Sequence, residues 1–335
     1  MKKRIISMLM VVMMILSLTA CGKKGGNDAA TAKDVLTKIA EYEGKQMDMT
    51  FDIEVEGEKM SFRIAASQLS DTEVGLDMYM TYGTSGEVKL TTMYGSNTEI
   101  YVNLQEILDA LVVIEPSFAA YTAYYQLPSD WVLVTLEDLK MLYAMMGVDT
   151  TAFDLAMAAE EDQKASEEFE TKTIEAFGNF LDEYANAAGN EVLAVENGTV
   201  TFKLNNENVA AAMKALASID VEKYINDYVA AVESIEGTEE TVEQLKEMSV
   251  GLNDAIKDLE AEAANVSDDD KVNLTCSFGT DAKGANVTFA MTEEGDYQNM
   301  TMSFVMNMTE KATGSYSAPA ECTTLTELLA ALGMY

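Results

Sequence analysis

The chain has 335 residues, of which 57 are acidic, 22 are basic and none is histidine, giving a formal net charge of −35. This charge argues against nucleic acid and anionic headgroups as partners, because phosphate contacts need clustered Lys and Arg. The absence of histidine excludes Ser-His and Cys-His nucleophiles and removes the usual nitrogen ligand of zinc.

The N-terminus has the three parts of a secretory signal peptide. Basic residues 2–4 precede an apolar run from Ile5 to Leu16, and mostly small residues then lead to Cys21. The apolar run is shorter than the about 20 residues that a membrane-spanning helix needs. We therefore expect residues 1–20 to be a signal peptide that is removed from the mature protein.

The junction Leu18-Thr19-Ala20-Cys21 resembles the lipobox of bacterial lipoproteins. In that family a diacylglycerol is attached to the cysteine, which becomes the first mature residue. The resemblance implies an acyl (palmitate-type) anchor on Cys21, a lipid-anchored place on the extracytoplasmic face of a bacterial cell membrane, and envelope proteins as candidate partners. An ordinary signal peptide with an incidental cysteine is the alternative. Residues 21–33 are polar and contain glycines, which is typical of a flexible tether.

We expect residues 34–335 to form a single α+β domain that begins with a helix over 30–42. After this helix, apolar and polar residues alternate in runs separated by short turns, which predicts strands. In the fourth strand this alternation predicts that Val88, Leu90 and Thr92 lie on one side. The five expected strands of this antiparallel meander are residues 47–55, 60–66, 74–80, 88–92 and 100–104.

The rest of the chain alternates between helical patterns and strands. Asn197-Gly198 lies between two alternating runs and predicts a hairpin. The expected helices are 105–113, 136–146, 208–218 and 325–332, with long helical insertions at 152–188 and 221–264, and the further strands are 131–134, 192–204, 272–278, 285–292 and 298–309.

This order predicts an α+β fold, a large curved antiparallel β-sheet with helices packed on its apolar, concave face. Together with the lipobox and tether, the order resembles that of the LolA/LppX type of lipoprotein carrier over residues 31–335. In that group a curved sheet and a helical lid enclose an apolar cavity for acyl chains. The two helical insertions are longer than the helical segments of that family.

Methionines are frequent on the apolar sides of the expected strands. Methionine is unbranched and polarisable, and it suits surfaces that adapt to apolar partners. We therefore identify nine of them as candidate hydrophobic ligand contacts, and the alternative is an ordinary core packed under helices. The nine are Met47, Met49, Met60, Met78, Met80, Met300, Met302, Met306 and Met308.

Cys276 and Cys322 are the cysteines that follow Cys21. They could form a disulfide outside the cell, or both could be small buried hydrophobic residues. The acidic clusters at 160–162, 239–240 and 268–270 do not match the spacing of an EF-hand loop, so we expect no metal site. We find no catalytic motif and expect neither an enzyme nor a bound cofactor.

These patterns predict a non-catalytic extracytoplasmic lipoprotein that binds a lipid or another hydrophobic ligand between its sheet and helices. The alternative is a structural or protein–protein interaction lipoprotein with a filled core and acidic helical faces.

Overall fold

The computed structural model describes most of the chain after the expected signal peptide. The expected signal peptide (1–20), Cys21 and the tether up to residue 30 lie outside the described residues, as does most of the helix expected at 136–146. The described residues are 31–331 apart from 43, 71, 84–85, 97–98, 123–126, 136, 139, 142–162, 234–238, 264–270, 295–298 and 313.

The fold is α+β, which confirms the predicted class. A large, mostly antiparallel sheet has the strand order β12-β6-β5-β4-β3-β2-β1-β11-β10-β9-β8-β7. The chain forms two compact units. Unit 1 contains residues up to 43 and 151–286, and therefore both helical insertions, whereas unit 2 contains residues 44–150 and 287–335.

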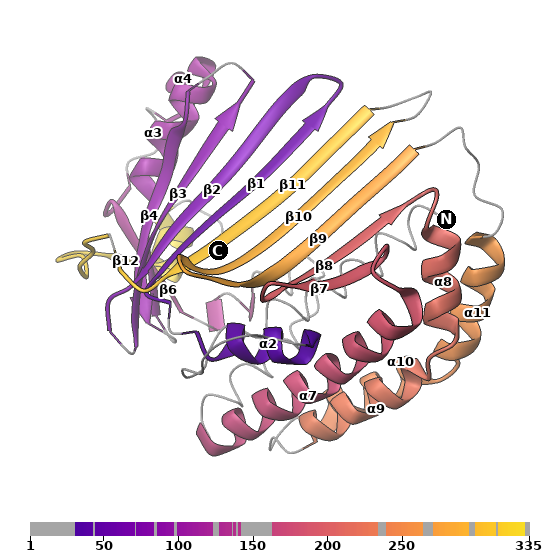
Figure 1. Ribbon diagram of the computed structural model, residues 1–335. Coiled ribbons are helices and arrows are strands. Elements are labelled where there is room, and N and C mark those ends of the chain that lie inside the picture. The colour runs from indigo at the N-terminus through magenta and orange to yellow at the C-terminus, as the bar shows by residue number, and fades with distance from the viewer. Residues whose placement is uncertain are drawn as a thin grey trace. The chain divides into compact units, whose positions relative to one another are not determined.

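Unit 1 combines the helical insertions with a short β-hairpin and one long strand (Figure 1). The hairpin turns at Asn197 and Gly198, whose φ angles of 52° and 77° are those of the predicted Asn-Gly turn. The elements are α2 (Ala32–Ala40), α7 (Gln163–Ala188), β7 (Leu193–Glu196), β8 (Thr199–Asn205), α8 (Val209–Ala217), α9 (Val221–Val232), α10 (Glu239–Ser249), α11 (Leu252–Ala263) and β9 (Lys271–Asp281).

Helix α2 begins inside the range expected to be tether. Thr31 is its N-cap and forms a capping box with Asp34, in which each side chain accepts a hydrogen bond from the other residue's backbone N–H. The range 21–33 was therefore too long at its C-terminal end, because residues 31–33 already belong to the cap and first turn of a helix.

The apolar side of α2 packs on the sheet of unit 1. Val35 and Leu36 are at most 1 % exposed, and α2 contacts β8 and β9. On β9 the alternate residues Leu274, Cys276 and Phe278 are buried. A helix therefore covers the apolar sheet face in this unit, as the sequence predicted.

Unit 2 contains the antiparallel meander and its continuation through β11. The pairing of β1 with β11 joins the start of this unit to its last long strand, and β12 lies parallel to β6. The elements are β1 (Gln46–Val55), β2 (Glu58–Gln68), β3 (Glu73–Tyr82), β4 (Val88–Ser96), β5 (Glu99–Asn103), α3 (Leu104–Ile114), η1 (Pro116–Phe118), α4 (Ala119–Thr122), β6 (Trp131–Thr135), β11 (Asn299–Thr309), β12 (Thr323–Thr324) and α12 (Leu325–Ala331), while β10 (Gly284–Glu294) begins in unit 1 and continues into unit 2.

The fourth strand corrects one detail of the sequence analysis. The register between β3 and β4 shifts at Met78/Tyr79, so that Thr91 pairs with Met78 while Lys89 pairs with Tyr79. Such a bulge adds one residue to a strand and changes which side chains face which side. Thr91 is consequently 1 % exposed on the side that was predicted for Thr92.

A candidate ligand surface on the sheet of unit 2

The strand registers bring all nine predicted methionines onto one face of β1, β2, β3 and β11. Cross-strand partners point to the same side of a sheet, and alternate residues of one strand share a side. We call this surface the methionine face. Its residues are Met47, Met49, Phe51, Ile53, Val55, Met60, Phe62, Ile64, Ala66, Leu76, Met78, Met80, Met300, Met302, Phe304, Met306 and Met308.

A row of phenylalanines crosses the middle of the methionine face. Phe51 pairs with Phe304 on one side and with Phe62 on the other. In the next row Met49 pairs with Met306 and with Ile64. The phenylalanines were not among the predicted ligand contacts, although the same period-two alternation that identified the methionines also places them on this face.

Burial varies across the methionine face without a simple gradient. Tyr82, the cross-strand partner of Met60 near the β1–β2 turn, is 55 % exposed, and Val74, two residues before Leu76 at the other end, is 42 % exposed, whereas Met308 and Ala66 are 7 % exposed. The remaining eight of the nine methionines are half-buried. They are thus neither sealed in a core nor fully in water.

These four strands pair with one another and with their neighbours in the sheet. In unit 2 the contacts of β1 are with β2 and β11, those of β2 extend to β3, and those of β3 extend to β4. This arrangement differs from unit 1, where α2 packs on the sheet. In unit 2 most apolar side chains of the methionine face are half-buried.

The opposite face of the same strands is polar and carries a network of ion pairs and hydrogen bonds. Asp77 accepts from Lys89 Nζ at 2.8 Å, from Thr92 Oγ1 at 3.2 Å and from Tyr316 Oη at 3.1 Å. Glu106 on α3 accepts from Thr92 Oγ1 at 2.9 Å. Helix α3 and the segment around Tyr316 thus make polar contacts with the face opposite the methionines.

The chain around Tyr316 crosses this polar face as a strap. The Gly314 N–H donates to Ser67 Oγ at 3.1 Å, and Ser67 Oγ donates to Gln46 Oε1 at 2.6 Å. The ring of Tyr316 lies where a Cβ on Gly75 would be. We call residues 314–316 the strap. Its contacts hold it on the side of the sheet away from the candidate ligand surface.

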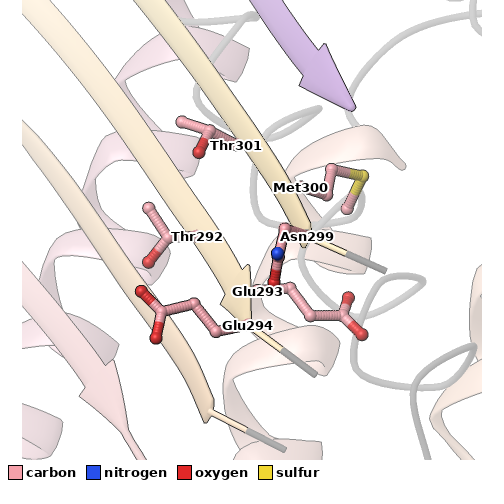
Figure 2. A pocket seen from close by; sticks show the side chains of 6 residues that line it. All are labelled: Thr292, Glu293, Glu294, Asn299, Met300 and Thr301. Atoms are coloured by element: carbon pink, nitrogen blue, oxygen red, sulfur yellow. The ribbon is translucent and has the colours of Figure 1, made fainter. Parts of the chain in front are cut away.

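An open pocket of about 410 Å³ lies where β10 ends and β11 begins. Figure 2 shows the side chains of Glu293 and Met300 on one side of these strands, and those of Thr292 and Thr301 on the other. The pocket therefore touches the methionine face only through Met300. Its other lining residues, Glu294 and Asn299, are polar, so it is not an apolar cavity for a ligand.

The two cysteines after Cys21 are free thiols in the structure. Cys276 is buried on β9, and burial raises the pKa of its thiol to about 11. This matches the interpretation of Cys276 as a small buried hydrophobic residue. Cys322 is exposed, so the same interpretation does not fit it, and no disulfide joins the two.

Within the described residues, no group of three or more acidic or cysteine side chains is arranged to hold a metal ion. No helix in that part of the chain is both long enough and apolar enough to span a membrane.

Comparisons with known proteins add little to this description. No protein family and no curated protein matches the chain. Among solved structures, it is similar to the dehydratase domain from the CurK module of the curacin polyketide synthase, at 8 % identity and a TM-score of 0.13, over 81 % of this chain and 77 % of that one. An inactive mutant of the CurK dehydratase matches at 9 % identity and a TM-score of 0.12, over the same shares of the two chains. Neither similarity identifies a fold or a function.

Proposed function

We propose that this protein is a non-catalytic, membrane-anchored extracytoplasmic lipoprotein whose methionine face binds a lipid or another hydrophobic ligand. The observation that supports this most strongly is the convergence of nine methionines from four strands on one surface, where eight of them are half-buried. Removal of the remaining exposed apolar area of this half-buried face from water by an apolar partner lowers the free energy, by about 25 cal/mol per Å².

The chemistry of the face favours binding over reaction. Its residues are methionines, phenylalanines and aliphatic side chains, so it contains no general acid, no base and no oxygen nucleophile. Methionine side chains are flexible, and they fit apolar partners of variable shape. We therefore infer that this surface binds a hydrophobic molecule and does not make or break a covalent bond.

The membrane anchor is part of the proposal and is supported by the sequence alone. The segment that ends at Cys21 resembles a lipobox, and acyl chains on that cysteine would hold the protein at a membrane surface. Such a position would keep the methionine face near a source of hydrophobic ligands.

Native mass spectrometry of residues 22–335, purified from cells without the acyl anchor, tests the proposal. We expect additional bound mass that extracts into organic solvent and is identified as lipid. A clean protein mass that stays clean after incubation with membrane lipids would contradict ligand binding. That outcome would favour the alternative, an interaction protein whose acidic helices contact envelope proteins.

Two neighbouring cross-strand pairs provide a matched control for the location of the ligand. Met49 pairs with Met306 on the methionine face, and Thr50 pairs with Val305 on the opposite face. We expect Met49→Gln/Met306→Gln to reduce the fraction of lipid-bound protein, because two amides would replace apolar contacts of similar size. Thr50→Gln/Val305→Gln should leave that fraction near the wild-type value.

A further inference from the structure

Two pairs of methionines face each other across β1 and β11. Met47 is the cross-strand partner of Met308, and Met49 is the partner of Met306. In the pairings of β1 with β2 and β11, and of β2 with β3, methionine faces methionine at no other position. The two pairs are also neighbours along the strands, because each strand contributes two methionines with one residue between them. We call these four residues the methionine quartet.

The strand register brings the four side chains of the quartet within reach of one point. Directly opposed Cβ atoms are about 5 Å apart, and alternate residues of one strand are about 7 Å apart. The four Cβ atoms therefore lie near the corners of a rectangle of about 5 by 7 Å on one side of the sheet. Methionine carries its sulfur on an unbranched, flexible chain. Three or four of these sulfurs can consequently meet at a single ion above the rectangle.

The quartet keeps contact with solvent and has no net charge at its border. Met47, Met49 and Met306 are half-buried, and only Met308 is buried. Beyond the ends of β1 and β11 at this side of the unit, Lys45 and Glu310 are both exposed and have opposite charges. A small ion can therefore reach the thioether groups without being repelled by a like charge.

Thioether sulfur is a soft and uncharged ligand. Such sulfur selects Cu(I), whereas Ca²⁺ and Mg²⁺ need oxygen ligands. Zinc sites use thiolate, imidazole or carboxylate groups, and the quartet contains none of these. Phe51 and Phe304 form the next row of the face, and this apolar border disfavours an ion that keeps its hydration shell. The ligand set thus fits a soft monovalent ion far better than a hard one.

We propose that the methionine quartet is a binding site for Cu(I), in which three or four thioether sulfurs of β1 and β11 hold one ion. The expectation of no metal site was based on the acidic clusters and did not consider thioethers. The inference does not rest on the proposed function, because the ion needs sulfur and a lipid needs only apolar area. The strongly negative chain would also favour the approach of any cation.

Titration with silver nitrate tests the site, because Ag(I) shares the charge and softness of Cu(I) and is not oxidised in air. Residues 22–335 with Cys322→Ser are titrated by calorimetry in chloride-free buffer that contains excess Ca²⁺. Neither the exposed thiol nor surface carboxylates then capture the probe, and Cys276 is buried. We expect one Ag(I) ion to bind per chain. Absence of binding would overturn the inference.

Two sets of four Met→Leu substitutions locate the ion. Leucine is close to methionine in volume, so each set removes four sulfurs and keeps the face apolar. The first set changes the quartet, and the matched control changes Met60, Met78, Met80 and Met302 of the same face. We expect the first set to weaken Ag(I) binding at least about tenfold and the control to change it less than about twofold. Equal affinities of the two variants would overturn the inference.

A spectrum of the protein with its methionines unchanged decides the matter if the quartet variant does not fold. With ¹³C-labelled methionine methyl groups, Ag(I) should shift the signals of the quartet and leave that of Met213 on α8 in place. Shifts confined to other methionines would place the ion elsewhere and overturn the inference.

Lipid uptake by the same variants separates this inference from the proposed function. Because leucine preserves apolar area, the quartet variant should keep the lipid-bound fraction that Met49→Gln/Met306→Gln loses. Lipid uptake by a protein that binds no Ag(I) would overturn the metal site alone. Ag(I) binding at the quartet of a protein that takes up no lipid would support the metal site and contradict the proposed function.

Discussion

Gly75 lies directly against the strap. A Cβ at this position would overlap the ring of Tyr316. The backbone of Gly75 is extended within β3, so its lack of a side chain serves close packing and not a special turn. Tyr316 in turn donates to Asp77 Oδ2 at 3.1 Å, so the ring is fixed at both its face and its hydroxyl.

We expect Gly75→Ala to lower the free energy of unfolding by about 1–3 kcal/mol, because the added methyl group forces the Tyr316 ring to move. Urea unfolding monitored by circular dichroism measures the change. Gly86→Ala is the control, since a Cβ there meets nothing within 4 Å. Equal free energies of unfolding for the two variants would contradict close packing of the strap on Gly75.

The thiols give a second prediction at the residue scale. In residues 22–335 a maleimide at pH 7 should label Cys322 rapidly and Cys276 only after unfolding, because Cys276 is buried and its pKa is raised to about 11. Mass spectrometry should show one label on the native protein and two in denaturant. The native Cys322→Ser variant should carry no label. If the protein with both cysteines failed to gain a second label in denaturant without reductant, this would indicate a disulfide and contradict the prediction.

Single residues also show what the sequence could and could not predict. The period-two pattern sufficed to place Met49 and Met306 on an apolar face, because alternation is a local property of a strand. The contact between Gly75 and Tyr316 was not predictable in this way. Its two residues are far apart in the sequence, and neither carries a local pattern that indicates the other.

At the scale of elements, the start of α9 depends on a residue of α11. Asn253 Oδ1 accepts from the backbone N–H of Val221 at 3.0 Å, and Asn253 Nδ2 donates to Asp220 Oδ1 at 2.8 Å. Asp220 is the N-cap of α9 and accepts from Lys223 N. Two helices thus share the capping of one N-terminus, whose first N–H groups have no partner within the helix.

We expect Asn253→Ala to lower the free energy of unfolding by about 1–2 kcal/mol, the range found for loss of a helix cap. The measurement is urea unfolding followed by the helical signal in circular dichroism. Asp258→Ala, at an exposed position of the same helix, should change stability by less than about 0.5 kcal/mol. If Asn253 did not stabilise the N-terminus of α9, Asn253→Ala and Asp258→Ala would unfold at the same urea concentration.

Most elements were predictable, and the exception has a physical cause. The helices and strands of both units follow the periodicity of the sequence, including the Asn197-Gly198 turn. The side chains of β4 were assigned to the wrong faces after Leu90, because one extra residue reverses the alternation. No local composition around Leu90 distinguishes a bulge from a regular strand.

At the scale of the whole molecule, the two units use similar sheet surfaces in different ways. In unit 1, α2 covers apolar strand residues such as Leu274 and Phe278, and these are at most 4 % exposed. In unit 2, Glu106 of α3 and Tyr316 of the strap bind the polar side of the sheet, and eight of the nine methionines are half-buried. The sequence could not predict this difference, because an alternating strand does not show which element covers it.

The most direct test of the methionine face is its oxidation by hydrogen peroxide, with and without bound lipid. Peptide mass spectrometry follows sulfoxide formation at each methionine of residues 22–335, and half-buried Met213 on α8 of unit 1 serves as the internal control. The proposal predicts that lipid slows the oxidation of Met49, Met302 and Met306 at least severalfold and leaves Met213 unchanged. Equal oxidation rates at all four methionines in the two samples would contradict a ligand on this face.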